Sequence, residues 1–451
     1  MKRVVAGLIG ASTLITALIT ALTPTQAVAP FDVVAASADV SAVAQSVMIP
    51  TDVVRVAQTS VMSLDVYNRA TSAADAARAT WSPSRGASVP MDRVTRGGSI
   101  VQQPEIPGFH FPMNVTVLPT EAVAPLMGRD VAAVLARAEI VMGATTARLR
   151  DARVGDAVDL LADSGATITF SVGMIAPDAT IGGTELLLSP AQGDQIGVTD
   201  VTSILIWGFP ARDSIDAALT NAGLDSRTDT RIRRSWDAFD PDFNLSMAET
   251  KRLLGEFAYR MRANGTDADV TPTWVNTFMP PTKETYPTGI NARCNNAIRA
   301  DLQAALAQVV SSGLGGQIDV ANANRYGGCF YPRFNRVTGN LGFLSRHSWG
   351  APLDTNTTTN AQGAVPQMNC DVVRIFRKHN FAWGGNFLTA DGMHFEWVGE
   401  PRDQYQYPSR YCPNLPPPLG INSASTDANP VSTPRTTRAT LLQDDGWGTG
   451  E

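Results

Sequence analysis

Two short stretches in the last third of the chain decide how its fold is interpreted. Residues 346–356 read RHSWGAPLDTN, and residues 389–397 read TADGMHFEW. Each stretch holds a histidine and a nearby aspartate: His347 with Asp354, and Asp391 with His394. One such pair is common and usually marks nothing more than a hydrogen bond at the surface. Two pairs in one compact segment, in a chain with only four histidines, indicate a shared site.

The spacing of these residues suits a metal centre built on a loop and a strand. Gly350 and Pro352 lie between His347 and Asp354, which favours a turn running into a strand over one face of a helix. A hydrolytic zinc site needs three nitrogen or oxygen ligands, an open fourth position and a base for the proton of water. The segment offers such groups in order. Asp391 precedes His394 closely enough to lie beside a metal without being a ligand.

A further histidine of this region is predicted to be structural. His379 shares a predicted helix face with Ile375 and Phe376 in DVVRIFRKHNF. A histidine on such a face is expected to be a hydrogen-bonded core or boundary residue.

The two segments resemble a known family. SRHSWGAPLD and FAWGGNFLTADGMHFEW are similar to the signature segments of the VanY-like zinc D-alanyl-D-alanine carboxypeptidases and L-alanyl-D-glutamate endopeptidases, which cut peptidoglycan stem peptides. The family pattern S-x-H-x-x-G-x-A-x-D is met at Ser345, His347, Gly350 and Asp354. The resemblance covers roughly residues 315–400. It implies a Zn²⁺ cofactor and gives each candidate a role: His347, Asp354 and His394 as metal ligands and Asp391 as the catalytic carboxylate.

Two further comparisons with the family pattern concern single positions. The segment RYGGCFYPR resembles the stretch upstream of the first motif, where an arginine faces the substrate, so Arg333 is the first candidate for this role and Arg325 the second. Pro352 stands where the family has alanine. Because proline fixes φ and lacks a backbone donor, it either reshapes the turn or disturbs the approach of Asp354.

The cysteines and the N-terminus predict export. Lys2 and Arg3 precede an apolar run and small residues up to Ala29, which is the plan of a secretory signal peptide over residues 1–29. A retained membrane anchor is the alternative, and no other stretch is long and apolar enough to cross a membrane. All four cysteines fall in the last third, and we favour two disulfides, Cys294–Cys329 and Cys370–Cys412, although spacing does not fix the connectivity.

The rest of the chain is predicted to form an α+β protein with several regions. An amphipathic helix, with Ile298, Leu302, Leu306 and Val309 on one face, opens a zinc peptidase domain of a small antiparallel sheet and flanking helices. Ser246 and Glu249 are expected to cap a helix that ends at Asn264 and Gly265. The predicted regions are an extended linker (30–111), a small α/β domain of unknown role (112–210), a helical connector (211–284), the peptidase domain (285–413) and a disordered tail (414–451).

The charge of the chain argues against one class of partner, and the motifs indicate one class of enzyme. The net charge of −6, without a long basic run, argues against nucleic acid as a partner, and the arginines of RIRR (231–234) are expected to form a solvated face balanced by nearby aspartates. The expected function is a secreted or wall-associated peptidase acting on peptidoglycan stem peptides, most simply a D-alanyl-D-alanine carboxypeptidase. An L-alanyl-D-glutamate endopeptidase is one alternative. A catalytically inactive wall-binding or regulatory protein is another, which the intact Asp391 argues against.

Overall fold

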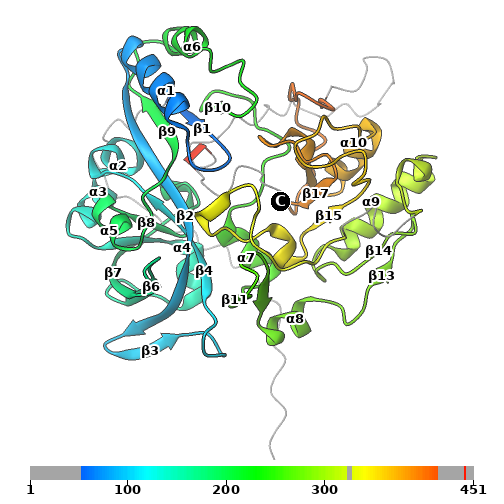
Figure 1. Ribbon diagram of the computed structural model, residues 1–451, viewed down its shortest axis with the longest axis horizontal. Helices are drawn as coiled ribbons and strands as arrows, with labels where there is room; N and C mark the ends of the chain where they lie inside the picture. Colours follow the sequence, from blue (N-terminus) through cyan, green and yellow to red (C-terminus); the bar gives the residue numbers. More distant parts are fainter. Residues whose placement is uncertain (1–51, 322–327, 415–440, 443–451) are drawn as a thin grey trace, which may run out of the picture. The chain divides into compact units, whose positions relative to one another are not determined.

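A mixed β-sheet that closes on itself makes up the first half of the chain in the computed structural model (Figure 1), which describes residues 52–321, 328–414 and 441–442. The strand order is β10-β1-β9-β2-β4-β8-β5-β7-β6, and β2 also pairs with β6, which closes six strands into a barrel. The short strand β3 pairs with β2 alone. The strands are β1 (Val53–Ala57), β2 (Thr80–Arg96), β3 (Ser99–Gln102), β4 (Phe111–Val117), β5 (Ile140–Gly143), β6 (Ala157–Leu161), β7 (Thr167–Ala176), β8 (Leu186–Leu188), β9 (Val201–Trp207) and β10 (Arg231–Arg234).

The predicted linker (30–111) and the predicted small α/β domain (112–210) are not separate regions. Both contribute strands to one sheet, and the long strand β2 connects them. β2 pairs with β9, β4 and β6 in turn, and its register shifts at three places along its length. Its Pro and Gly residues therefore mark bends of a closing sheet, where bulges are common, and do not mark a spacer. Residues 53–102 hold β1, β2 and β3, and β4 to β9 complete the same sheet.

Helices cover the outside of this sheet, and apolar side chains fill the barrel. α1 (Leu64–Ala76) and α6 (Arg212–Asn221) pack together over β1 and β9, while α2 (Thr120–Met127) and α3 (Arg129–Ala136) cover another face. In the chain, α4 (Ala144–Arg150) lies between β5 and β6, and α5 (Pro190–Gln195) lies between β8 and β9. Part of the predicted tail also packs here: Leu441 and Leu442 are buried against the α2–α3 side, and the Arg55 guanidinium donates to the carbonyl of Leu441.

The segment between the barrel and the C-terminal sheet contains both helices and strands, which corrects the predicted helical connector. It holds α7 (Met247–Leu254), β11 (Tyr259–Met261), β12 (Ala268–Val270) and α8 (Pro272–Phe278). Ser246 caps α7 as predicted, since its hydroxyl accepts a hydrogen bond from the backbone N–H of Glu249 at 3.2 Å. The helix ends at Leu254 and not at Asn264. Gly255 has φ of 83°, and a Cβ there would lie 2.4 Å from the Phe278 ring, so only glycine fits this sharp exit.

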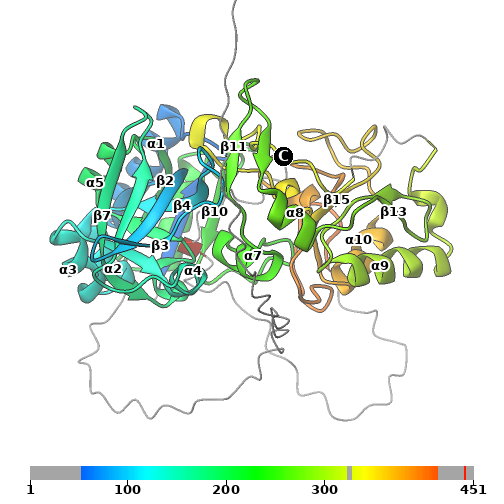
Figure 2. The same ribbon diagram turned by 90° about the horizontal axis from the view of Figure 1, so that it is seen from below.

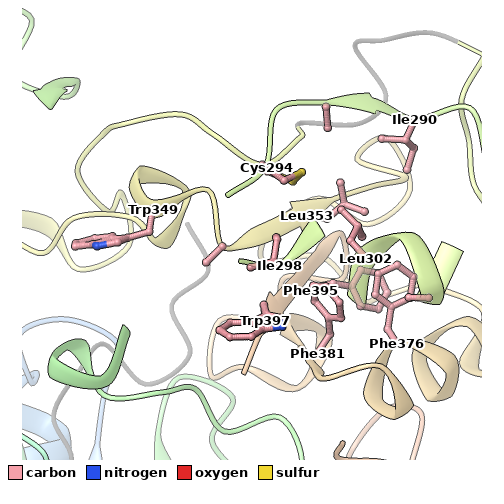
Figure 3. Close-up of a cluster of buried hydrophobic side chains, with 14 of the residues drawn as sticks. Ile290, Cys294, Ile298, Leu302, Trp349, Leu353, Phe376, Phe381, Phe395 and Trp397 are labelled. Atoms are coloured by element: carbon pink, nitrogen blue, oxygen red, sulfur yellow. A yellow bond between two sulfur atoms is a disulfide. The ribbon is translucent and has the colours of Figure 1, made fainter. Parts of the chain in front are cut away.

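The last region is a small antiparallel sheet packed against two helices, as expected. The sheet order is β15 (Pro352–Asp354), β17 (His394–Trp397) and β16 (Phe381–Trp383), with α9 (Arg299–Ser311) and α10 (Cys370–Lys378) beside it. A short pair, β13 (Glu284–Thr285) and β14 (Asn291–Ala292), precedes α9. Figure 3 shows the shared core, in which Ile298, just before α9, and Leu302 of α9 lie near Leu353 and Phe395 of the sheet.

Both predicted disulfides are present. Cys294 is bonded to Cys329 and Cys370 to Cys412, with Cα–Cα distances of 4.9 and 5.0 Å. Within the described residues, no helix combines the length and apolar character that a membrane span requires. The predicted signal peptide, most of the predicted tail and Arg325 lie outside the described residues. Figure 2 gives the second view of these elements.

Candidate metal centre

A single turn and a strand pairing bring the two sequence motifs together. Ser345 caps the 3₁₀ helix η5 (Arg346–Trp349), its hydroxyl accepting from the backbone N–H of His347 at 3.3 Å. The turn ends at Gly350 and leads into β15, whose last residue is Asp354. In the β15–β17 ladder, Asp354 stands directly opposite His394. The local turn therefore supplies one histidine, and the sheet register supplies the other.

The predicted ligand residues form a buried cluster. The Nε2 atom of His347 lies 3.0 Å from Oδ2 of Asp354, and Nδ1 of His394 lies 3.1 Å from Oδ1 of the same carboxylate. One donor atom from each of the three residues lies within 4.8 Å of the others, and all three residues are buried. Pro352 does not keep Asp354 from this cluster. It lies on β15, an edge strand, where a missing N–H is tolerated.

His347 and His394 each face Asp354 with one ring nitrogen and are oriented by a hydrogen bond at the other ring nitrogen. Nδ1 of His347 lies 2.8 Å from the backbone carbonyl of Cys329, and since a carbonyl only accepts, this nitrogen carries the proton. Nε2 of His347 is then the ring nitrogen that faces Asp354. Nε2 of His394 lies 3.0 Å from Oε2 of Glu396. Glu396 is only 2% exposed, so it orients His394 and is not a solvent-facing carboxylate.

The carboxylates of Asp354 and Glu396 favour a positive charge on the group that lies between them, which is the His394 ring. Burial lowers the pKa of His394, but its hydrogen bonds to Asp354 and Glu396 outweigh this and raise the pKa to about 10. Burial raises the pKa of Asp354, but the charge of His347 and the hydrogen bonds from both histidines hold that pKa well below its usual range. A divalent cation would take the place of a proton here, because ligands bind metals in their deprotonated form.

Asp391 lies next to this cluster on a tightly closed loop, residues 384–391. Its backbone N–H donates to the carbonyl of Gly384 at 2.8 Å, and its own carbonyl accepts from the N–H of His394 at 3.2 Å. Its carboxylate is buried, with Nε2 of Gln362 at 3.5 Å from Oδ2. The loop begins with the 3₁₀ helix η6 (Gly384–Asn386). The structure therefore keeps Asp391 beside His394 by backbone hydrogen bonds.

Arg333 is buried beside the turn that carries His347. Its backbone N–H and carbonyl both bond to the hydroxyl of Ser348 at 3.2 Å, and its carbonyl accepts from the N–H of Ser345 at 2.9 Å. Its guanidinium lies over the ring of Tyr331, at 5.7 Å from the centroid. These contacts tie Arg333 to the first motif.

The other histidines do not join the cluster. Nε2 of His379 bonds to the side-chain oxygen of Gln308 at 2.7 Å, which confirms the predicted structural role. Nδ1 of His110 lies 2.6 Å from Asp92, in the barrel region. The contacts of Cys329 and Gln362 with the site could not be inferred from sequence, because they depend on how separate loops fold back.

Comparison with known proteins agrees with the motifs. Residues 338–397 match a family model described as D-alanyl-D-alanine carboxypeptidase, and this span includes all three candidate ligands and Asp391. A search of curated proteins finds no match. The similarity supports a peptidase that acts on peptidoglycan.

Proposed function

We propose that this protein is an exported zinc peptidase that hydrolyses peptidoglycan stem peptides, with D-alanyl-D-alanine carboxypeptidase activity as its simplest form. The observation that carries the proposal is the convergence of two imidazoles and one carboxylate from separate motifs into a buried, hydrogen-bonded cluster. The two disulfides are typical of proteins in oxidising compartments, which supports export.

The residues fit zinc by their chemistry. Two neutral imidazole nitrogens and a carboxylate oxygen form a set typical of catalytic zinc sites, in which three protein ligands leave one position open. Metal-binding histidines usually donate their second ring N–H to a carbonyl or a carboxylate. His347 bonds in this way to the Cys329 carbonyl, and His394 to the Glu396 carboxylate. When bound, zinc supplies Lewis acidity that eases attack of water on a peptide carbonyl.

The chain's own residues would perform the proton transfers. Asp391 is the proposed base, accepting the proton of the attacking water and then donating it to the departing amine. Its burial and its backbone hydrogen bond to Gly384 support this role, because a base must be held in one place. Arg333 is the proposed cationic group for the developing oxyanion or a substrate carboxylate.

Two substitutions at the site test this proposal against a non-catalytic wall-binding role. The purified mature protein is incubated with muropeptides, with and without a chelator, and the products are identified by mass. Asp391→Asn is expected to retain zinc while cleavage falls by about 10²- to 10⁴-fold, because only the proton acceptor is lost. Asp354→Asn is expected to weaken zinc binding itself, since an amide oxygen is a poorer ligand.

The products also separate the possible activities. Release of a terminal D-alanine supports the carboxypeptidase, whereas cleavage next to D-glutamate identifies an endopeptidase. Binding of zinc and wall fragments without any cleavage by the wild type would overturn the enzymatic proposal. Full activity of Asp391→Asn would show that this carboxylate is not the base.

A further inference from the structure

The barrel region contacts the loop that carries the proposed base. We infer that it positions this loop, residues 384–391, for catalysis, and that Arg231 is the positioning residue through which it acts. The inference rests on the proposed function, because that function gives Asp391 its role. It assigns a task to a region that contributes no residue to the metal cluster.

Two contacts join the barrel region to the loop. The guanidinium of Arg231 donates through Nη2 to the backbone carbonyl of Asn386. The hydroxyls of Thr59 and Thr389 lie 3.1 Å apart, and Thr389 is close in sequence to Asp391. The two contacts therefore hold the loop at two points between Gly384 and Asp391.

Both contacts come from the same end of one strand pair. β1 and β10 are antiparallel, and their last register pair is Ala57 opposite Arg231. Thr59 lies two residues beyond the end of β1. Because β1 is also paired along its length with β9, this end is part of the barrel sheet and not a free loop. A fixed sheet edge can therefore set the position of residues 384–391.

The side chain of Asn386 is held separately, which isolates the contribution of Arg231. The amide Nδ2 of Asn386 donates to Oδ2 of Asp242 at 2.8 Å and to the carbonyl of Tyr411 at 3.0 Å. Its Oδ1 accepts from the N–H of Tyr411 at 2.9 Å. These partners fix the side chain, while Arg231 binds the backbone carbonyl. Loss of Arg231 thus removes a charged donor from the backbone carbonyl of Asn386.

Loss of the Arg231 contact is expected to displace Asp391 and to leave zinc binding unchanged. The loop closes onto itself where Gly384 bonds to Asp391, so a shift at Asn386 is transmitted to the base over a few residues. A displacement of about 1 Å in a reacting group can reduce the rate by about 10²-fold. The proposed ligands His347 and Asp354 lie on η5 and β15, outside the loop that Arg231 holds, so zinc should remain bound.

The test uses the full chain loaded with zinc and three variants of β10. Arg231→Met removes the donor, and Arg231→Lys keeps a charge and a donor. Arg234→Met is the matched control, because Arg234 lies on the same strand and pairs with Asp216 of the barrel region at 2.5 Å. For each protein, kcat and KM on a muropeptide, zinc content and hydrogen exchange of peptides covering residues 384–394 are measured.

We expect Arg231→Met to lower kcat by about 10- to 100-fold, with KM within about threefold of wild type and zinc content unchanged. Backbone exchange in residues 384–391 should rise in Arg231→Met, recover partly in Arg231→Lys and stay at the wild-type level in Arg234→Met. Should Arg231→Met fail to fold, Thr59→Val is measured in its place and is expected to raise exchange near Thr389.

Either of two results would overturn the inference: unchanged exchange of residues 384–391 in Arg231→Met, or loss of zinc together with activity. The exchange measurement does not require turnover. If the wild type cleaves no muropeptide, the proposed function fails, while the exchange data still decide whether Arg231 positions the loop.

Discussion

Adding one methyl group at Gly384 should misplace the proposed base without touching its carboxylate. A Cβ built on Gly384 would lie 2.6 Å from the carbonyl oxygen of Asp391 and 3.0 Å from Cβ of His394. Ordinary contacts begin at 3.4 Å, so the backbone of Asp391 has to move by about 0.8 Å (3.4 minus 2.6). The backbone of Gly384 is not in the left-handed region, so the effect of alanine here is purely steric.

The expected loss follows from this displacement. Since a shift of about 1 Å in a reacting group can cost about 10²-fold in rate, Gly384→Ala should lower kcat by roughly 30- to 100-fold. The assay is muropeptide hydrolysis, with zinc content measured on the same samples. Gly316→Ala is the control, because a Cβ there meets nothing within 4 Å. If Gly384→Ala keeps kcat within about threefold of wild type, the tight packing of Asp391 is not needed for catalysis and the reasoning is wrong.

Three further predictions concern stability and metal binding. Arg377→Met should lower the free energy of unfolding by about 3–5 kcal/mol in urea titrations, because it leaves the buried carboxylate of Asp242 without its cation. Replacing Cys370 and Cys412 together by serine should cost about 2–4 kcal/mol in the same assay. Removing zinc with a chelator should lower the melting temperature of the wild type, and this shift should vanish in Asp354→Asn, which starts with little metal.

The metal region was largely predictable because its signals are local. The turn between His347 and Asp354 is encoded by a capping serine, Gly350 and a short strand, so the spacing of the motif carries its geometry. The apolar face of α9 follows a helical period, and its residues are buried as expected. The favoured cysteine pairing is present, and its two bridges span 35 and 42 residues of the chain, although spacing alone left the connectivity open.

The barrel could not be predicted because its closure depends on distant partners. β2 pairs at one end with β9, more than a hundred residues away, and Pro83 and Pro90 inside it suggested turns. The arginines of β10 were expected to be solvated. The expected balance by aspartates is partly present, since Arg233 pairs with Asp240, but Arg233 is buried and not solvated. Arg231 reaches Asn386, and Asp242 pairs with Arg377. Such partners are set by tertiary structure, which neither charge spacing nor periodicity encodes.

The disulfide between Cys294 and Cys329 lies beside the proposed metal site, so in the proposed enzyme oxidation of these cysteines would favour metal binding. The carbonyl of Cys329 is the group that fixes the proton of His347, so the crosslinked residue itself aims a ligand nitrogen. A chain kept reduced holds this carbonyl less firmly and should take up zinc poorly. Maturation would then run in a fixed order, with oxidation first and metallation second. Protein made in a reducing cytosol should consequently contain less than a full complement of metal until its thiols are oxidised.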